Sequence, residues 1–543
     1  MIGLGKAPCD DGVIQSSEQH SECTQAAKPW VLAATILGSS MAFIDGSVVN
    51  VALPAIATDL AASVAGMQWV VNAYALLLAS LILISGVAGD RFGRRRVFAL
   101  GIVLFMLASV WCGLAADVEQ LIFARAVQGV GGAMLVPSSL AIISATFETH
   151  ERGRAIGTWA GFSAVTAALG PVLGGWLVDA VSWRAIFFIN VPLALLALMI
   201  TLTRVPESRA NQENPALDWR GALLAVTGLA ALTYGLIVAA ELGWSHAVVI
   251  GALLAAVLIL SVFLRVEARA ASPMLPLTLF RSPTFSGANL MTLLLYFGLS
   301  GSLFFLPFNL IQVQDYSATQ AGAAFLPFTI IMGGLSRWAG GLLARYGARP
   351  PLVVGPVVAA CGLALFAWPG IGGSYWTTFF PGMVVLALGM TISVAPLTTT
   401  VINAVDNRYA GTASGVNNAV SRTATLLAVA VLGVVALQVF RVSLDERLMM
   451  LNVPPAIEKI VVRTSDRLAG VQVPANATPA AREALQRAAD ESFVTSFRAV
   501  MLTAAGCALA GAACAGLMIA PATGGGQRRQ GGATFKSGVN PGP

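Results

Sequence analysis

Residues 86–95 read GVAGDRFGRR, and the same spacing of glycine and arginine returns at residues 340–349, which read GGLLARYGAR. A second pattern, Asp59 six residues before Ala65, returns at Asp315 with an alanine six residues later. Each pattern lies beside an apolar run in both places. A repeat of this length predicts two halves with the same fold, because each copy is one structural unit.

The composition indicates a membrane environment for both halves. Of the 543 residues, 57% are hydrophobic and 11% are charged, and the mean hydropathy is +0.77. Soluble domains carry about 25% charged residues, so this chain lacks the charge that a water-exposed surface needs. These figures exclude a disordered chain, a coiled coil and a disulfide-rich secreted scaffold. The six cysteines form no CxxC pair and the three histidines show no ligand spacing, so we expect no metal and no cofactor.

Fourteen apolar runs are long enough to cross a bilayer as helices of about 20 residues. They begin near Trp30, Trp69, Val97, Leu121, Ala155, Ala185, Gly221, Ala247, Phe285, Ala321, Leu352, Trp376, Thr412 and Phe493. The repeat makes spans 1–6 equivalent to spans 9–14 and leaves spans 7 and 8 as an extra central pair. The predicted segments are an N-terminal tail (1–29), a first half (30–204), the extra pair with its loops (205–283), a second half (284–520) and a C-terminal tail (521–543).

The positions of Lys and Arg predict the orientation of these spans. With a cytoplasmic N-terminus, basic loop residues gather in the even-numbered connections, whereas the short external loops contain Arg184 alone. By the positive-inside rule, we expect both termini in the cytoplasm and the chain in the cytoplasmic (inner) membrane. This sorting explains the net charge of +6, which therefore does not indicate nucleic acid. Residues 441–491 are predicted as a long external loop with an amphipathic helix at 479–490, and its sequon at Asn476 is interpreted as chance.

The motif at residues 86–95 resembles the loop signature of the major facilitator superfamily. Together with the span count and the motifs below, the chain resembles the fourteen-span drug:proton antiporter branch, the EmrB/QacA type, from about Trp30 to Met518. The resemblance implies an all-α polytopic fold of two six-helix halves plus two extra central spans, which rocks about a central site. It also implies a conformational latch on the cytoplasmic side, formed by Gly86, Asp90, Arg91, Gly93 and Arg95. The alternative is that these arginines only enforce the topology.

Span 1 carries IDGSVVNVALP at residues 44–54, which resembles the first-span signature of that branch. Its Asp45 is the one acidic residue placed well inside spans 1–6. A carboxylate in hydrocarbon must be paired, protonated or turned toward water. Burial favours its neutral form and a nearby cation favours its ionised form, which is the balance that a reversible proton carrier needs. A structural acid satisfied by hydrogen bonds is the alternative.

Arg125 is the expected partner of Asp45, because the helical rise places both residues at about 22 Å from the cytoplasmic side. The part of span 4 that holds Arg125 and Gln128 also resembles the fourth-span motif of the superfamily, whose arginine is linked to proton transfer. A purely structural ion pair remains open.

Span 5 and several other spans supply the remaining candidates. GPVLGG at residues 170–175 resembles the antiporter signature, in which glycines pack closely and a proline bends the helix, although Thr166 replaces one expected glycine. The antiporter residues are Gly157, Gly170, Pro171, Gly174 and Gly175. The candidate residues of the substrate cavity are Asn50, Trp69, Asn72, Tyr74, Gln128, Tyr296, Phe305 and Arg422. The aromatic members at helical spacing equally fit ordinary packing.

These motifs predict export of amphipathic or cationic small molecules in exchange for protons, across a lipid bilayer. The alternative within transport is export or uptake of a single endogenous metabolite. A membrane-embedded enzyme or sensor is disfavoured, because the sequence contains no phosphate loop, catalytic triad or metal cluster. The expected partners are therefore a lipophilic substrate, protons and lipid, and the need for a periplasmic adaptor is left open.

Overall fold

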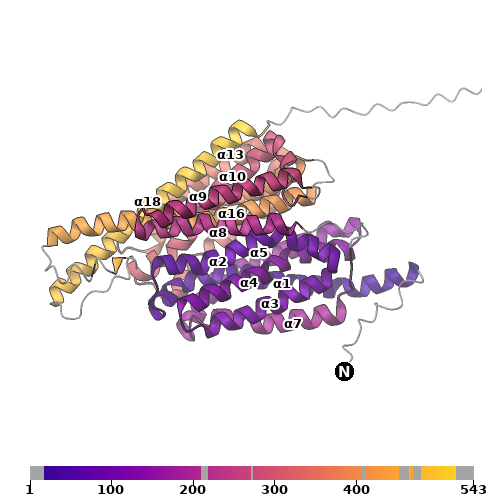
Figure 1. Cartoon of the computed structure of the whole chain (residues 1–543), viewed down its shortest axis with the longest axis horizontal. Helices are drawn as coiled ribbons and strands as arrows, with labels where there is room; N and C mark the ends of the chain where they lie inside the picture. The colour runs from indigo at the N-terminus through magenta and orange to yellow at the C-terminus, as the bar shows by residue number, and fades with distance from the viewer. Residues whose placement is uncertain are drawn as a thin grey trace, which may run out of the picture.

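The computed structural model describes residues 17–209, 218–270, 273–405, 410–451, 461, 464–465, 468 and 478–520, and these contain helices but no β-strand. The first sixteen residues, the sequon at Asn476 and the C-terminal tail at 521–543 lie outside this description. The helices form a bundle in which most axes run along one direction (Figure 1). The predicted all-α fold is therefore confirmed.

The first half is a series of long helices joined by short turns. Side chains at the turns cap the helices: Ser63 Oγ accepts the Gly66 N–H at 3.2 Å, and Asp117 Oδ1 accepts the Gln120 N–H at 2.8 Å. Such caps satisfy the free N–H groups with which a helix begins. The helices are α1 (Ser17–Asp59), α2 (Val64–Phe92), α3 (Arg94–Leu114), α4 (Val118–Thr146), α5 (Thr149–Ala180), α6 (Ala185–Phe188) and α7 (Asn190–Arg204).

Two further helices, α8 (Trp219–Leu242) and α9 (Ala247–Arg269), form a hairpin before the second half. A 3-10 turn η1 (Leu277–Arg281) follows, and α10 continues into one turn of π-helix. The second half consists of α10 (Pro283–Phe308), η2 (Asn309–Val313), α11 (Ala318–Ala323), α12 (Leu326–Tyr346), α13 (Arg349–Leu365), α14 (Tyr375–Thr378), α15 (Phe380–Asn403), α16 (Ala410–Leu451) and α18 (Pro479–Met518).

The two halves repeat the same packing. In the first half α1 packs on α5 and α7, and α4 packs on α2 and α3; in the second half α10 packs on α16 and α18, and α15 packs on α12 and α13. The halves meet where α2 packs on α16 and where α5 packs on α11 and α12. The α8–α9 hairpin packs on α2 and α16, beside one of these two seams. The internal repeat predicted from residues 86–95 thus corresponds to a repeated arrangement of helices.

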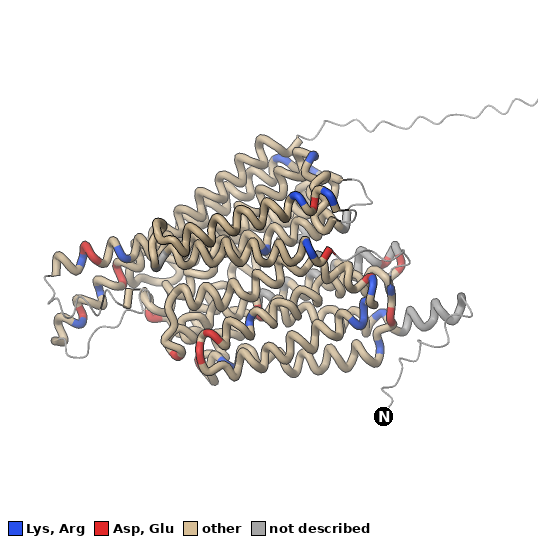
Figure 2. Tube along the Cα trace, viewed as in Figure 1, with Lys and Arg blue, Asp and Glu red and all other residues tan. Residues whose placement is uncertain are grey.

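Twelve helices in the described part of the chain are long and apolar enough to cross a membrane by length and composition. Two shorter apolar helices, Leu169–Ala180 and Arg349–Leu365, belong to α5 and α13. Charged side chains gather at the two ends of the bundle and leave its middle almost free of charge (Figure 2). The basic end, as we call it, carries the turn between α2 and α3, with Arg94 to Arg96, and the turn between α12 and α13, with Arg345 and Arg349.

The predicted loop at 441–491 differs from the structure. α16 continues to Leu451 and α18 begins at Pro479, so both helices run past the rest of the bundle at the end opposite the basic end (Figure 1). The helix predicted at 479–490 is confirmed as the first part of α18. An ion pair between Arg447 and Glu491 joins the two extensions. A helix of 42 residues is about 63 Å long, twice the hydrocarbon thickness, because each residue adds about 1.5 Å.

Candidate functional site

A buried ion pair joins the first and fourth helices at the middle of the bundle. Arg125 Nη1 donates a hydrogen bond to Asp45 Oδ2, and the two residues are 1% and 0% exposed. Arg125 Nε donates to the Val70 carbonyl of α2 at 3.1 Å. The pairing agrees with the depth argument from the sequence. Removing two charges from water is costly, so such a pair persists only where further hydrogen bonds satisfy both groups.

Gln128 supplies those further hydrogen bonds. Its Nε2 donates to Asp45 Oδ1 at 2.8 Å, and its Oε1 accepts from Arg125 Nη1 at 2.6 Å. The same Nε2 lies 2.9 Å from Ser109 Oγ of α3, and Asn190 of α7 donates to that hydroxyl at 3.3 Å. Ser109 and Asn190 were not singled out from the sequence, where nothing marks them as neighbours of Asp45. Each of the two carboxylate oxygens of Asp45 thus accepts a hydrogen bond.

Glycines let the arginine reach this position. A Cβ atom on Gly129 would lie 2.5 Å from the Tyr74 carbonyl, and one on Gly132 would lie 3.1 Å from the Tyr74 hydroxyl. The absence of these side chains brings α4 against α2, so that the Arg125 guanidinium lies 4.3 Å from the centre of the Tyr74 ring. The Phe187 ring lies 5.9 Å away on another side. Both rings stabilise the buried cation through their π-electrons.

A small polar pocket adjoins the ion pair. The central pocket has a volume of about 60 Å³, room for a few water molecules. Arg125 forms part of one wall, and Arg422 of α16 forms part of another, so both halves of the protein contribute a guanidinium. Among the described residues Arg422 has no hydrogen-bond or ion-pair partner. The lining residues are Gly46, Val49, Asn50, Val71, Tyr74, Ala75, Leu78, Arg125, Arg422 and Thr425.

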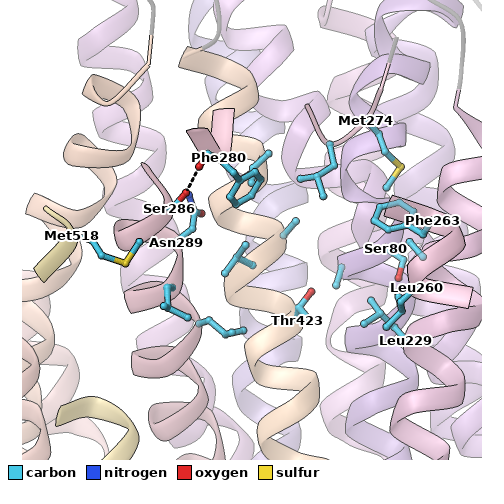
Figure 3. A pocket seen from close by; sticks show the side chains of 18 residues that line it. Ser80, Leu229, Leu260, Phe263, Met274, Phe280, Ser286, Asn289, Thr423 and Met518 are labelled. Carbon is cyan, nitrogen blue, oxygen red and sulfur yellow. Dashed lines mark hydrogen bonds between the residues drawn. The ribbon is translucent and has the colours of Figure 1, made fainter. Parts of the chain in front are cut away.

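A larger cavity lies between α2, α8, α9, α10 and α16. This lateral cavity has a volume of about 500 Å³ and is lined mainly by apolar side chains. Figure 3 shows Leu229, Leu260 and Phe263 beside Ser80, with Ser286 and Asn289 of α10 on the other side and Thr423 between them. This cavity could not be predicted from the sequence, because its walls come from segments that are far apart along the chain.

The predicted cavity residues separate into two groups. Asn50, Tyr74 and Arg422 line the central pocket, and Gln128 bonds to the ion pair beside it. The other four line neither of the two cavities: Trp69, Asn72, Tyr296 and Phe305. Their assignment to the substrate cavity stays a prediction.

Ring contacts account for the positions of two of these four residues, Trp69 and Phe305. Trp69 contacts Tyr234 of α8, with ring centres 6.5 Å apart, and so helps to attach the extra hairpin. Phe305 is 1% exposed and packs on Phe304 at 4.9 Å, inside the hydrophobic core. Asn72 is fully buried, and both polar atoms of its side chain lack a partner. Tyr296 is half-buried on α10.

Two acids hold the turn at residues 86–95. Asp90 Oδ1 accepts from Arg94 Nε at 2.9 Å, a contact that joins the end of α2 to the start of α3. Glu207 Oε1 accepts the Arg95 N–H in the first turn of α3, at 3.0 Å. Gly93 has a φ of +110°, and a Cβ there would lie 2.8 Å from the Glu207 carboxylate. The sequence missed Glu207 because 112 residues separate it from Arg95.

The remaining residues of the predicted latch differ in exposure. Arg91 is exposed and lies over the Phe92 ring at 5.4 Å, whereas Arg95 is half-buried and its Nη1 donates to the Val205 carbonyl at 3.0 Å. A Cβ added to Gly86 would lie 3.7 Å from the Pro137 Cβ of α4, an ordinary contact distance. Arg95 thus joins α3 to the segment after α7, and Gly86 faces α4, all within the first half.

The glycine face of α5 forms a close contact between the two halves. A Cβ on Gly170 would meet Ser47, and one on Gly174 would meet Val48, both on α1. On the other side of the helix, a Cβ on Gly175 would meet the Ala318 carbonyl at the start of α11. Pro171 has the matching position against Gly322 of α11. Gly157 also lies in α5, but its surroundings fall outside the described part.

Asp179 strengthens this contact, and the sequence analysis overlooked it. Its carboxylate accepts the N–H groups of Ala318 at 3.1 Å and Thr319 at 2.7 Å, together with the Thr319 hydroxyl at 2.6 Å. Hydrogen bonds from these donors hold the pKa of Asp179 below its usual range, although burial alone would raise it. The end of α5 thereby caps α11 of the opposite half, at the end of the bundle away from the basic end.

Two repeated six-helix halves around a central polar pocket define the class of secondary transporters. Residues 35–429 match the profile of the Major Facilitator Superfamily, and the chain belongs to this family. It is a transporter and not an enzyme, and it is a multi-pass membrane protein.

The chain is similar over most of its length to proteins that are named for drug resistance or export. It is 35% identical to the "Tetracenomycin C resistance and export protein" of Streptomyces glaucescens, over 77% of this chain and 80% of that protein. It is 36% identical to the "Multidrug resistance protein Stp" of Mycobacterium tuberculosis, over 74% of each chain. A solved bacterial homologue of the human lysosomal transporter Spinster shares the fold, with a TM-score of 0.61, 18% identity and coverage of 90% of this chain and 97% of that one.

Proposed function

We propose that the protein is a proton-coupled exporter of lipophilic and amphipathic small molecules, of the fourteen-span EmrB/QacA type. The single observation that carries the proposal is the buried Asp45–Arg125–Gln128 network at the wall of the central pocket. Protonation of this carboxylate would break the ion pair and leave Arg125 with its hydrogen bonds to the Val70 carbonyl and Gln128 Oε1. The resistance and export names of several relatives support an exported drug as the substrate.

The fourteen-span topology follows if α5 and α13 also cross the bilayer. α5 has 32 residues and α13 has 17, lengths of about 48 and 26 Å at about 1.5 Å per residue. A span needs about 17 to 25 residues. The positive-inside rule then puts the basic end, and both termini with it, in the cytoplasm.

In this proposal, proton transfer takes place in the first half, which contains the Asp45–Arg125–Gln128 network. Protonation of Asp45 would remove the negative charge that Arg125 faces and release the guanidinium toward the central pocket. The second half has uncharged contacts instead: Asn417 of α16 donates to Asn289 Oδ1 at 3.2 Å and to Thr292 Oγ1 at 2.7 Å, both on α10. One proton that enters down 100 mV releases about 2.3 kcal/mol, enough for about 40-fold accumulation of a neutral substrate.

The packing supports access to the site from the basic end. The opposite end is closed by the α5–α11 contact and the Asp179 cap. In the half of α12 nearer the basic end, a Cβ added to Gly340 or Gly341 would meet nothing within 4 Å. We therefore assign this arrangement to the inward-facing state, in which an exporter takes up its substrate.

Arg422 narrows the chemistry of the substrate. It adds a second positive charge to the central pocket, and no acidic side chain of the described residues pairs with it. A neutral substrate, or one with an electronegative group, therefore fits this pocket better than a permanent cation does. This places amphipathic neutral compounds ahead of the cationic compounds expected from the sequence.

Purified protein in liposomes tests the proposal. Wild-type protein should couple substrate movement to proton flux, and Asp45→Asn should abolish that flux while protein yield stays normal. Asp59→Asn is the matched control, since Asp59 is an exposed acid at the end of the same helix, bonded to Trp183 and Arg184. Substrate-linked proton flux that survives in Asp45→Asn would refute the assignment. Transport without any proton flux in the wild type would favour a uniporter of a single metabolite.

A further inference from the structure

The lateral cavity has the size and chemistry of a binding site for a small lipophilic molecule. Its volume of about 500 Å³ falls in the range of about 300 to 1,000 Å³ that is usual for small-molecule pockets. Leucine, alanine, phenylalanine, valine and methionine side chains dominate the lining. Its polar side chains are Ser80, Ser286, Asn289 and Thr423.

The extra hairpin builds one wall of this cavity. Ala225 and Leu229 of α8, with Leu260 and Phe263 of α9, face α10 and α16 across the empty space (Figure 3). The hairpin has no counterpart in the repeat, so two six-helix halves alone would leave this seam facing lipid. The α8–α9 pair therefore converts an exposed seam into a partly open apolar cavity.

One hydroxyl in the cavity has no partner. Ser80 is 3% exposed, and its Oγ makes no hydrogen bond. Two of the other polar groups are occupied: Ser286 donates to the Phe280 carbonyl at 2.6 Å, and Asn289 donates to the Phe285 carbonyl at 2.9 Å. A buried hydroxyl without a partner is unfavourable, and a ligand with a hydrogen-bonding group would satisfy it.

The lateral cavity and the central pocket share a wall. On α2, Ser80 lines the lateral cavity and Leu78 lines the central pocket. On α16, Thr423 lines the lateral cavity and Arg422 lines the central pocket. The two spaces therefore lie on either side of the seam where α2 packs on α16.

We propose that the lateral cavity binds the apolar body of the transported molecule, taken from the membrane leaflet at the basic end, before it reaches the central pocket. Ser80 bonds its polar group, and separation of α2 from α16 joins the two spaces. The inference rests on the proposed function, because it assumes that this substrate is lipophilic. It gives the extra hairpin a role: to enclose a site for molecules that arrive through lipid.

Photolabelling in lipid nanodiscs tests occupancy of the cavity directly. Benzophenone, a compact lipophilic photoprobe, should label the lining segments at 260–293 and 416–423 of the full-length protein, as mapped by mass spectrometry. The neutral lipophilic amine N-phenyl-1-naphthylamine should compete for this labelling. Labelling that is displaced by oleate but not by the amine would mean a site for a lipid acyl chain and would overturn the proposal. Labelling confined to other segments would overturn it as well.

Transport of the same amine into proteoliposomes tests the role of the cavity. Leu260→Trp fills the space and should raise the KM at least fivefold. Leu258→Trp is the matched control, because Leu258 lies on the same helix and is 66% exposed. Ser80→Ala, a smaller change that keeps the fold, should raise the KM about threefold. Equal KM values in all four proteins would overturn the proposal. Normal labelling without proton-coupled transport would instead refute the proposed function and leave the binding site in place.

Discussion

Asp45 and Arg125 form a buried ion pair, and either residue can be replaced alone. We expect the stability of the two resulting variants, Arg125→Met and Asp45→Asn, to depend differently on pH. Arg125→Met keeps the length of the side chain but leaves the Asp45 carboxylate buried, with Gln128 Nε2 as its one remaining donor. Breaking a buried pair by removing one partner costs about 3 to 5 kcal/mol. A carboxylate can avoid part of this cost by taking up a proton, whereas an arginine left by Asp45→Asn cannot lose one.

The sign of the pH dependence follows from proton counting. In Arg125→Met, the folded state holds a proton on Asp45 that the unfolded chain releases at neutral pH. Stability therefore falls as the pH rises, by at most about 1.4 kcal/mol for each pH unit over which Asp45 stays protonated in the folded state. In Asp45→Asn the buried cation stays charged at both pH values, so its loss of stability relative to the wild type should not change.

Thermal unfolding in detergent at pH 6, 7 and 8 measures this difference for the wild type and both variants. The double variant Asp45→Asn, Arg125→Met should be more stable than either single variant, because it buries no unpaired charge. A stability deficit in Arg125→Met that is the same at pH 6 and pH 8 would refute the reasoning. A double variant with the summed deficit of the two singles would show that the residues do not interact.

The remaining predictions concern the ends of the bundle. Glu207→Gln should reduce stability by about 1 kcal/mol, because it removes an anion from the start of α3. It should reduce both stability and transport more than Asp90→Asn does, because the pair of Asp90 with Arg94 is worth about 0.3 to 0.5 kcal/mol. Equal effects of the two substitutions in thermal unfolding and transport assays would contradict this. Asp179→Asn should weaken the cap of α11 by about 1 kcal/mol. A cysteine placed at position 319 should then react faster with a thiol reagent, and an unchanged reaction rate would count against the closed contact. In a chain without its native cysteines, a single cysteine that replaces Arg94 should be protected from an impermeant maleimide on intact cells. A single cysteine that replaces Thr478 should be labelled by it. The reverse pattern would show that the topology is inverted.

The properties that follow from local composition and helical rise could be derived from the sequence. The low charge predicts a membrane protein, because an unpaired charge in hydrocarbon is costly. The motif at 86–95 and its copy predict the repeated halves. Depth along a helix is proportional to residue number, so Asp45 and Arg125 could be matched across 80 residues of chain. That calculation gives the level of a side chain in the membrane and no more.

The direction in which each side chain faces, and which helix it meets, is decided by tertiary packing alone. Trp69 and Phe305 have the composition of a cavity lining, yet one attaches the α8 helix and the other lies in the core. Glu207 lies at the start of α3 because the end of α7 returns to that turn. The lateral cavity exists only where α8 and α9 lie over the seam between α2 and α16. Lateral contacts between apolar helices depend on small differences in shape, and the spacing of residues along one helix does not record them.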